Sequence, residues 1–174
     1  DPVLRKETEK VSEITPEIRT LISEMFDTMY AAEGIGLAAP QVGRTERITV
    51  MDVEGQKFAF VNPEIVEREG SIRGEEGCLS IPEIFGDVTR YSRVVVRALD
   101  EHGTEVEVEG TELLARCMQH EIDHLDGKLF IDYLSVLKRR SAMSKWDKLK
   151  EDYPGFIRKV SLEIQGPHHS EGEL

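Results

Sequence analysis

The sequence predicts an α+β fold in which mixed or antiparallel β-sheets surround a central helix that carries an HExxH motif. Helical apolar patterns lie near the N-terminus and in the second half of the chain, with short strand-like runs between them. Strands and helices do not alternate regularly, which disfavours a parallel sheet of βαβ units. The 174 residues are enough to bury a core without disulfide bonds. We expect one domain over residues 1–153 and a disordered C-terminal extension over residues 154–174.

The expected elements follow in chain order. A helix is predicted from about Pro16 to Glu33, because Thr15 can cap it, Pro16 suits its first turn and apolar residues recur at helical spacing. Strands are predicted, from their apolar and β-branched residues, at Arg47–Val53, Lys57–Val61, Arg93–Leu99, Glu105–Glu109 and Lys128–Tyr133. The third and fourth should form a hairpin that turns at residues 100–103, where His102 would be exposed.

The central helix contains the sequence His120-Glu121-Ile122-Asp123-His124. Histidines four residues apart lie on one helix face, so both imidazoles can reach one metal ion. Glu121 is rotated by about 100° and can reach a water on that ion without being a ligand. Thr111 is expected to cap this helix and Gly127 to end it. The pattern indicates a metal-dependent hydrolase, and the alternative is a chance HExxH on an ordinary amphipathic helix.

A catalytic metal usually has three protein ligands, so a third residue is needed. Downstream, His168 and His169 lie in a polar tail, and the acids there have no recognisable context. Upstream, Cys78 lies in the sequence Glu-Gly-Cys-Leu-Ser, and a thiolate is a strong ligand for zinc or ferrous iron. The alternative for any lone cysteine is a small buried apolar residue, and this is what we expect of Cys117.

A second glycine-containing segment, residues 34–41, has the sequence GIGLAAPQ. Its two glycines suggest a close approach of the backbone to another group, or a tight connector in which Gly34 ends the preceding helix. It is not a dinucleotide-binding loop, because a third glycine and a preceding strand are both missing.

Together, GIGLAAPQ, EGCLS (residues 76–80) and QHEIDHLDG (residues 119–127) resemble the three motifs of bacterial peptide deformylases, in the same order. The resemblance covers roughly Asp1 to Leu149. It implies a metal-dependent hydrolase that removes the formyl group from the N-terminal formyl-methionine of nascent polypeptides and releases formate. The implied nucleophile is a metal-bound water or hydroxide.

The resemblance implies that Cys78, His120 and His124 bind one divalent metal. Glu121 would then be the general base that takes a proton from water and passes it to the departing amine. The thiolate ligand favours ferrous iron, although zinc, nickel or cobalt could substitute.

The same resemblance implies that Gln41 and the backbone N–H of Leu79 form an oxyanion hole. Arg116 takes a position where the family has an aliphatic wall of the methionine pocket, and we expect its stem to pack while its charged head reaches solvent. The substrate site would accordingly be lined by Ile35, Gly36, Leu113 and Arg90.

Charge is unevenly distributed. The net charge of −12 argues against general nucleic-acid binding and specific DNA binding. The segment Leu137–Lys150 nevertheless carries six Lys or Arg residues against one Asp and predicts a basic helix. It is either a solvated face or, as the resemblance suggests, a surface that docks on the ribosome. Further on, Phe156–Ile164 is an amphiphilic piece of the tail.

The setting is expected to be cytoplasmic. No apolar run is long enough to span a membrane, and no signal peptide is recognisable. The two cysteines give no disulfide framework, and a thiolate ligand needs a reducing compartment. Two rival functions remain: an endopeptidase with a third ligand other than Cys78, and a structural site closed by four ligands.

Overall fold

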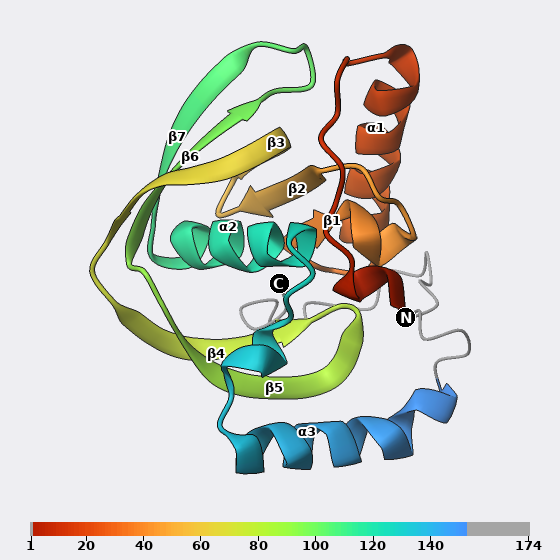
Figure 1. Cartoon of the computed structure of the whole chain (residues 1–174), viewed down its shortest axis with the longest axis vertical. Coiled ribbons are helices and arrows are strands. Elements are labelled where there is room, and N and C mark those ends of the chain that lie inside the picture. The colour runs from red at the N-terminus through yellow and green to blue at the C-terminus, as the bar shows by residue number, and fades with distance from the viewer. Residues whose placement is uncertain (1, 153–174) are drawn as a thin grey trace.

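Helix α2 (Glu112–Leu125), which carries the HExxH motif, lies between two antiparallel β-sheets (Figure 1). The structure is a computed structural model that describes residues 2–152 of the 174-residue chain. The predicted α+β arrangement around a central helix is confirmed. The predicted boundary at residue 153, the tail, its amphiphilic piece and His168 and His169 lie outside the described residues.

The larger sheet has five strands in the order β1-β2-β3-β6-β7. Their bounds are Gly36–Ala38 (β1), Ile48–Val53 (β2), Gln56–Glu69 (β3), Arg93–Leu99 (β6) and Glu105–Thr111 (β7). The smaller sheet is the hairpin β4 (Ile72–Cys78) and β5 (Ile81–Arg90). The chain leaves the larger sheet after β3 and returns at β6, so the hairpin lies across α2 from the other strands (Figure 1).

The other helices cover the outer sides of the molecule. Helix α1 (Pro16–Ala31) packs on β1 and β2, and helix α3 (Val136–Leu149) packs on β5 (Figure 1). Short 3₁₀ helices occur at Pro2–Arg5 (η1), Ala39–Val42 (η2), Phe130–Tyr133 (η3) and Lys150–Asp152 (η4). No helix among the described residues has the length and apolar character needed to cross a membrane.

Three apolar clusters support this arrangement. The first joins α1 to β1 and β2, and the second joins α2 to the inner face of the large sheet. The third lies under the β4–β5 hairpin and includes Leu4, Phe130 and Trp146, so it draws η1, η3 and α3 onto the hairpin. Cys78 belongs to this third cluster, whereas the helix that carries the two histidines belongs mainly to the second.

Most predicted elements are confirmed, with shifts at their ends. The N-terminal helix begins at Pro16 with Thr15 as its cap, since the Thr15 hydroxyl accepts the Ile18 N–H, but it ends at Ala31. The hairpin turn is stabilised by Asp100, whose carboxylate accepts two backbone N–H groups, and His102 is exposed there.

The predicted strands differ from the structure in three places. Lys128–Tyr133 is not a strand: its end forms η3, where Asp132 accepts the Leu129 N–H at 3.0 Å and the consecutive Phe130 and Ile131 are both buried. The whole β4–β5 hairpin was missed, and β3 extends to Glu69 instead of ending at Val61. These strands were missed because their charged side chains hide the alternation that marks a half-buried strand.

Helix α2 starts and stops near its predicted ends. Thr111 occupies the N-cap position, although its side chain makes no capping hydrogen bond. Gly127 ends the helix in the left-handed conformation (φ 75°), and the Lys128 N–H returns to the Asp123 carbonyl at 2.9 Å. A Cβ at Gly127 would lie 2.6 Å from the Arg5 carbonyl oxygen, so glycine also allows η1 to pack there.

Gly127→Ala should destabilise the protein more than Gly55→Ala. Both residues have positive φ (75° and 82°), which costs an alanine about 1 kcal/mol, but no atom lies within 4 Å of a Cβ at Gly55. The clash with Arg5 should add roughly 1–3 kcal/mol. Urea unfolding at a fixed metal concentration measures the difference, and equal losses in the two variants would contradict this packing.

Candidate metal centre

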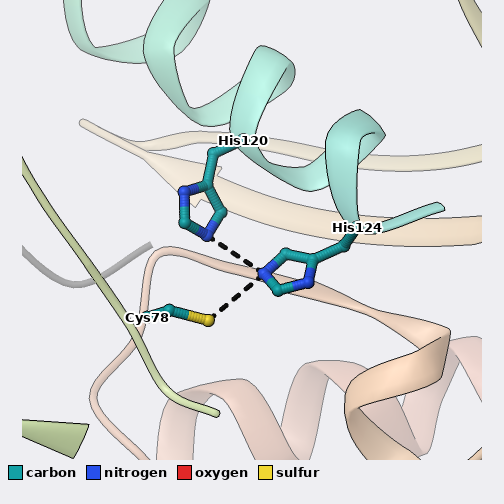
Figure 2. A group of neighbouring side chains, drawn as sticks. All are labelled: Cys78, His120 and His124. Atoms are coloured by element: carbon teal, nitrogen blue, oxygen red, sulfur yellow. Dashed lines mark hydrogen bonds between the residues drawn. The ribbon is translucent and has the colours of Figure 1, made fainter. Parts of the chain in front are cut away.

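Cys78, His120 and His124 bring their donor atoms together in the interior of the molecule (Figure 2). Cys78 Sγ lies 3.2 Å from His124 Nε2, which lies 3.1 Å from His120 Nε2. All three donor atoms lie within 4.8 Å of one another, and all three residues are buried. One thiol sulfur and two imidazole nitrogens at this spacing fit a single divalent ion such as zinc or ferrous iron.

The three residues reach this point from different elements. The histidines lie one helical turn apart on α2, as their spacing predicts. Cys78 is the last residue of β4, where the register with β5 shifts between Gly77 and Cys78 and the chain turns back at Leu79 and Ser80. That irregularity ends the ladder at the cysteine, whose Sγ lies against the His124 ring (Figure 2).

Glu76 positions the first histidine. Its carboxylate is fully buried and lies 2.9 Å from His120 Nδ1, so the imidazole donates Nδ1–H to it and leaves Nε2 free for a metal. Arg90 donates two further hydrogen bonds to Glu76, at 2.9 and 2.8 Å. Burial alone would raise the pKa of Glu76, but hydrogen bonds from Arg90 and His120 lower it to about 2.

Arg116 is buried as well, which corrects the expectation that its charged head reaches solvent. Its Nη1 donates to Glu76 Oε2 at 2.5 Å and to the Val88 carbonyl at 2.9 Å, and Nη2 donates to the Ile72 carbonyl at 3.1 Å. The β4–β5 hairpin covers this side of α2, and its carbonyls and Glu76 together satisfy the guanidinium. A helical-wheel projection that assigns α2 a single polar side facing solvent is therefore wrong about Arg116.

Burial favours the neutral form of the other two donors, His124 and Cys78. Burial lowers the pKa of His124 well below its usual value, and the neighbouring His120 lowers it further, so the imidazole is neutral. Burial raises the pKa of the Cys78 thiol to about 12, and the charge of Glu121 adds to the rise. A metal ion would displace this proton, because only the thiolate is a strong ligand.

Glu121 is a buried carboxyl group without a hydrogen-bond partner in the described part of the chain. Its side chain is fully buried, and neither carboxylate oxygen has a hydrogen-bond partner among the described residues. Burial raises its pKa well above the usual value, and Glu76 raises it further. A buried, unsatisfied carboxylate is costly unless it has a purpose, and a bound cation with its water would supply both charge and hydrogen bonds.

Gly36 and Gly34 allow two close approaches in this region. A Cβ at Gly36 would lie 2.8 Å from Glu121 Oε1 and 2.9 Å from Cys117 Sγ. A Cβ at Gly34 would lie 2.6 Å from Leu79 Cδ1. The glycine-containing segment therefore packs directly on the HExxH helix and on the turn after Cys78, as the close-approach interpretation predicts.

Gln41 also points into the centre. Its Nε2 lies 3.6 Å from Cys78 Sγ and 3.2 Å from Ser80 Oγ, while its Oε1 accepts the Ala38 N–H at 2.8 Å. That last bond fixes the amide so that its N–H groups face the metal donors. Leu79, the other predicted oxyanion-hole residue, is buried beside Cys78.

The predicted substrate residues do not all lie in one place. Ile35 precedes Gly36 and is half-buried, and Leu113 is half-buried against the apolar cluster of α2. Arg90 is directed elsewhere: its three nitrogens are engaged by Glu76 and Asp123, and its guanidinium lies over the Tyr133 ring. Arg90 thus supports His120 from behind, and we assign it no contact with substrate.

Two positioning residues were not predicted. Glu76 is part of the EGCLS motif but received no role, and Arg116 was expected at the surface. The available signal was the position of Glu76 two residues before the expected cysteine ligand, since a histidine that binds a metal commonly donates its other ring N–H to a carboxylate. Cys117, in contrast, is a buried apolar-cluster residue as predicted, and burial raises its pKa well above the usual value.

Known proteins share this sequence and fold. A family model described as polypeptide deformylase matches residues 1–140. The peptide deformylase of Alkalilimnicola ehrlichii is 52% identical over 153 residues, which cover 86% of this chain and 86% of that protein. The crystal structure of a peptide deformylase from Legionella pneumophila has a TM-score of 0.84 at 49% identity and covers 87% of this chain and 91% of its own.

A second solved structure, a peptide deformylase from Ehrlichia chaffeensis in complex with actinonin, has a TM-score of 0.82 at 40% identity and covers 88% of this chain and 94% of its own. The α+β fold and the Cys-His-His centre beside a buried glutamate define a metal-dependent hydrolase of the HExxH class. The chain belongs to the polypeptide deformylase family, as its three motifs predict.

Replacing Cys78 by alanine should abolish stable metal binding, because two imidazoles alone make a weak and incomplete site. Cys117→Ala is the matched control: Cys117 is equally buried, but it is not one of the three clustered donors. Metal content after gel filtration in a chelating buffer measures the effect. Full occupancy in the Cys78 variant would rule out its assignment as a ligand.

Proposed function

We infer that this chain removes the formyl group from the N-terminal formyl-methionine of nascent polypeptides and releases formate. The observation that carries the inference is the buried, unpartnered carboxylate of Glu121 beside the Cys78-His120-His124 donors, in a chain of the polypeptide deformylase family. An endopeptidase interpretation required a third ligand other than Cys78. A structural interpretation required a fourth ligand, and the cluster within residues 2–152 has three.

Amide hydrolysis needs a nucleophile at the formyl carbon, a stabilised oxygen and a proton for the departing nitrogen. A divalent ion held by Cys78, His120 and His124 would supply Lewis acidity, which would lower the pKa of water and polarise the formyl group. Glu121 takes the proton from the attacking water and delivers it to the amine nitrogen as the C–N bond breaks. Burial raises the pKa of Glu121, which makes its carboxylate a stronger base than an exposed one and suits it to accept a proton from water.

Gln41 is proposed to stabilise the developing negative charge on the formyl oxygen. Its amide is held by the Ala38 N–H, so its Nε2 donors are already oriented and no reorganisation is needed during the reaction. The Leu79 N–H is proposed as the second donor. A single donor of this kind is typically worth about 3–4 kcal/mol of transition-state stabilisation.

We propose ferrous iron as the metal and Ile35, Gly36 and Leu113 as part of the substrate groove. The glycine supports this placement, because the backbone approaches Glu121 more closely than any side chain would allow. A thiolate ligand that must remain reduced also favours the cytoplasm.

The direct test is a formate-release assay with formyl-Met-Ala-Ser, using protein loaded anaerobically with iron or loaded with nickel. Acetyl-Met-Ala-Ser and an internal-peptide substrate are the comparison substrates. Formate release without internal cleavage supports the assignment. Internal cleavage without formate release would instead support the endopeptidase.

Glu121→Ala should keep its metal and lose kcat by at least about 10²-fold, because a positioned general base is worth roughly 10²–10⁴ in rate. Removing the carboxyl group also removes two buried oxygens that have no hydrogen-bond partner within residues 2–152, so the variant should be no less stable to urea than the parent chain. Steady-state kinetics together with metal analysis separates loss of chemistry from loss of metal. Near-normal turnover would contradict the proposed proton transfer.

A second proposal concerns helix α3. It is exposed along most of its length, with Trp146 as its one buried residue, and its exposed side chains include five Lys or Arg, followed by a half-buried Lys150 in η4. This basic surface contrasts with the net charge of −12. We propose that it docks on ribosomal RNA, which would bring the site to nascent chains.

Reversing Lys138, Arg139 and Lys145 to glutamate should weaken co-sedimentation with ribosomes and leave formyl-tripeptide hydrolysis intact. Added salt should weaken binding of the parent chain, since phosphate contacts release counterions. Reversal of Lys6, Arg19 and Lys57, which lie outside α3, is the matched control for net charge. Equal binding by both triple variants would leave α3 as a solvated face.

A further inference from the structure

The metal donors are carried by elements whose residues belong to two different apolar clusters, although the His120 ring stacks on Phe130 of the cluster that contains Cys78. The histidines belong to α2, whose core is the inner face of the five-stranded sheet, whereas Cys78 belongs to the cluster beneath the β4–β5 hairpin. The distance between Cys78 Sγ and the two Nε2 atoms therefore depends on what joins α2 to the hairpin. The polar contacts of Arg116 are prominent among the connections.

Arg116 connects α2 to both strands of the hairpin. From its position four residues before His120, it donates to the Ile72 carbonyl on β4 and to the Val88 carbonyl on β5, at 3.1 and 2.9 Å. It also donates to Glu76 Oε2 at 2.5 Å, on the oxygen opposite the one that faces His120 Nδ1. One guanidinium thus contacts the hairpin backbone and the carboxylate that orients a ligand.

Charge balance gives Arg116 a second role. Arg90 is shared between two carboxylates, those of Glu76 and Asp123, at 2.8 and 2.5 Å. Without Arg116, this buried group would contain two anions and one cation. With Arg116, two cations (Arg90 and Arg116) balance two anions (Glu76 and Asp123). The Glu76 carboxylate can therefore remain ionised while Arg90 keeps its ion pair with Asp123.

Gly74 leaves the space that the guanidinium occupies. A Cβ at Gly74 would lie 3.0 Å from Arg116 Nη2 and 3.2 Å from its Cζ, and the glycine does not have the positive φ that would require glycine for backbone reasons. The side chain missing from β4 therefore makes room for Arg116. The position of the Arg116 guanidinium therefore depends on glycine at residue 74 as well as on the arginine itself.

We propose that Arg116 is a positioning residue for the metal centre. It holds the Cys78-bearing hairpin at a fixed distance from the histidines of α2 and keeps the Glu76 carboxylate on His120. The alternative is that Arg116 contributes only to overall stability. The two roles differ in whether the coordination of a bound metal changes in a variant that remains folded.

The test uses the full chain loaded with Co²⁺, whose thiolate charge-transfer and d–d absorption bands report on the ligands. Arg116→Met should shift these bands and speed metal release to a chelator by about 10–100-fold, the usual effect of losing a residue that supports a ligand. Arg116→Lys should recover part of both properties, since it restores the charge but not the forked contacts. Arg93→Met is the matched control, because Arg93 also lies among glutamates (Glu67, Glu69 and Glu109) but is partly exposed and remote from the site.

Gly74→Ala gives an independent reading, because it displaces the guanidinium by a few tenths of an ångström without removing charge. It should alter the Co²⁺ spectrum when residue 116 is arginine and leave it unaltered in the Arg116→Met background. An unchanged spectrum and release rate in folded Arg116→Met would overturn the proposal. If that variant does not fold, an unchanged spectrum in both Arg116→Lys and Gly74→Ala would overturn it equally.

Discussion

The buried carboxylate of Glu76 is the interaction on which the rest of the site depends. It is fully shielded from solvent, and it is contacted by Arg90, Arg116 and His120. A buried ion is costly to desolvate, and loss of one partner from such a group typically costs about 3–5 kcal/mol. With its pKa lowered to about 2, Glu76 remains an anion at neutral pH and accepts Nδ1–H of His120. The Glu76 carboxylate therefore determines which nitrogen of His120 carries the proton, and it also joins β4 to α2 through Arg116.

Two glutamates near the centre have opposite environments, and the difference defines their roles. Glu76 is matched by two guanidinium groups, whereas the oxygens of Glu121 have no partner within residues 2–152. Burial and the negative charge of Glu76 both raise the pKa of Glu121. Carboxylates whose surroundings push their pKa values apart serve different purposes, here a fixed anion and, under the proposed function, a proton carrier. The α2 helix places Glu121 one residue after His120, where the absence of a side chain at Gly36 makes room for its carboxylate.

Sequence patterns predicted the parts of this structure that depend on residues close together in the chain. The helical spacing of the two histidines, the caps of α1 and the turn at Asp100 all depend on local geometry, and the sequence contains that information. The β4–β5 hairpin was missed because its charged residues include both exposed side chains, such as Glu75, and buried ones, such as Glu76, whose partners are distant in sequence. Arg116 was misjudged for the same reason: a helical wheel cannot reveal that a hairpin distant in sequence supplies carbonyls to a charged head. Cys78 was found from its motif, but its distance from the histidines depends on that hairpin.

The protonation state of His120 tests the account most directly. Long-range ¹H–¹⁵N correlation spectra of the histidine-labelled, metal-free chain distinguish Nδ1–H from Nε2–H, and a His120→Gln variant assigns the signals. The account predicts a proton on Nδ1 of His120, shifted to low field by the Glu76 carboxylate, and loss of that low-field signal in Glu76→Gln. An Nδ1 of His120 that carries no proton, or an unchanged signal in Glu76→Gln, would contradict the claim that Glu76 orients the metal ligand.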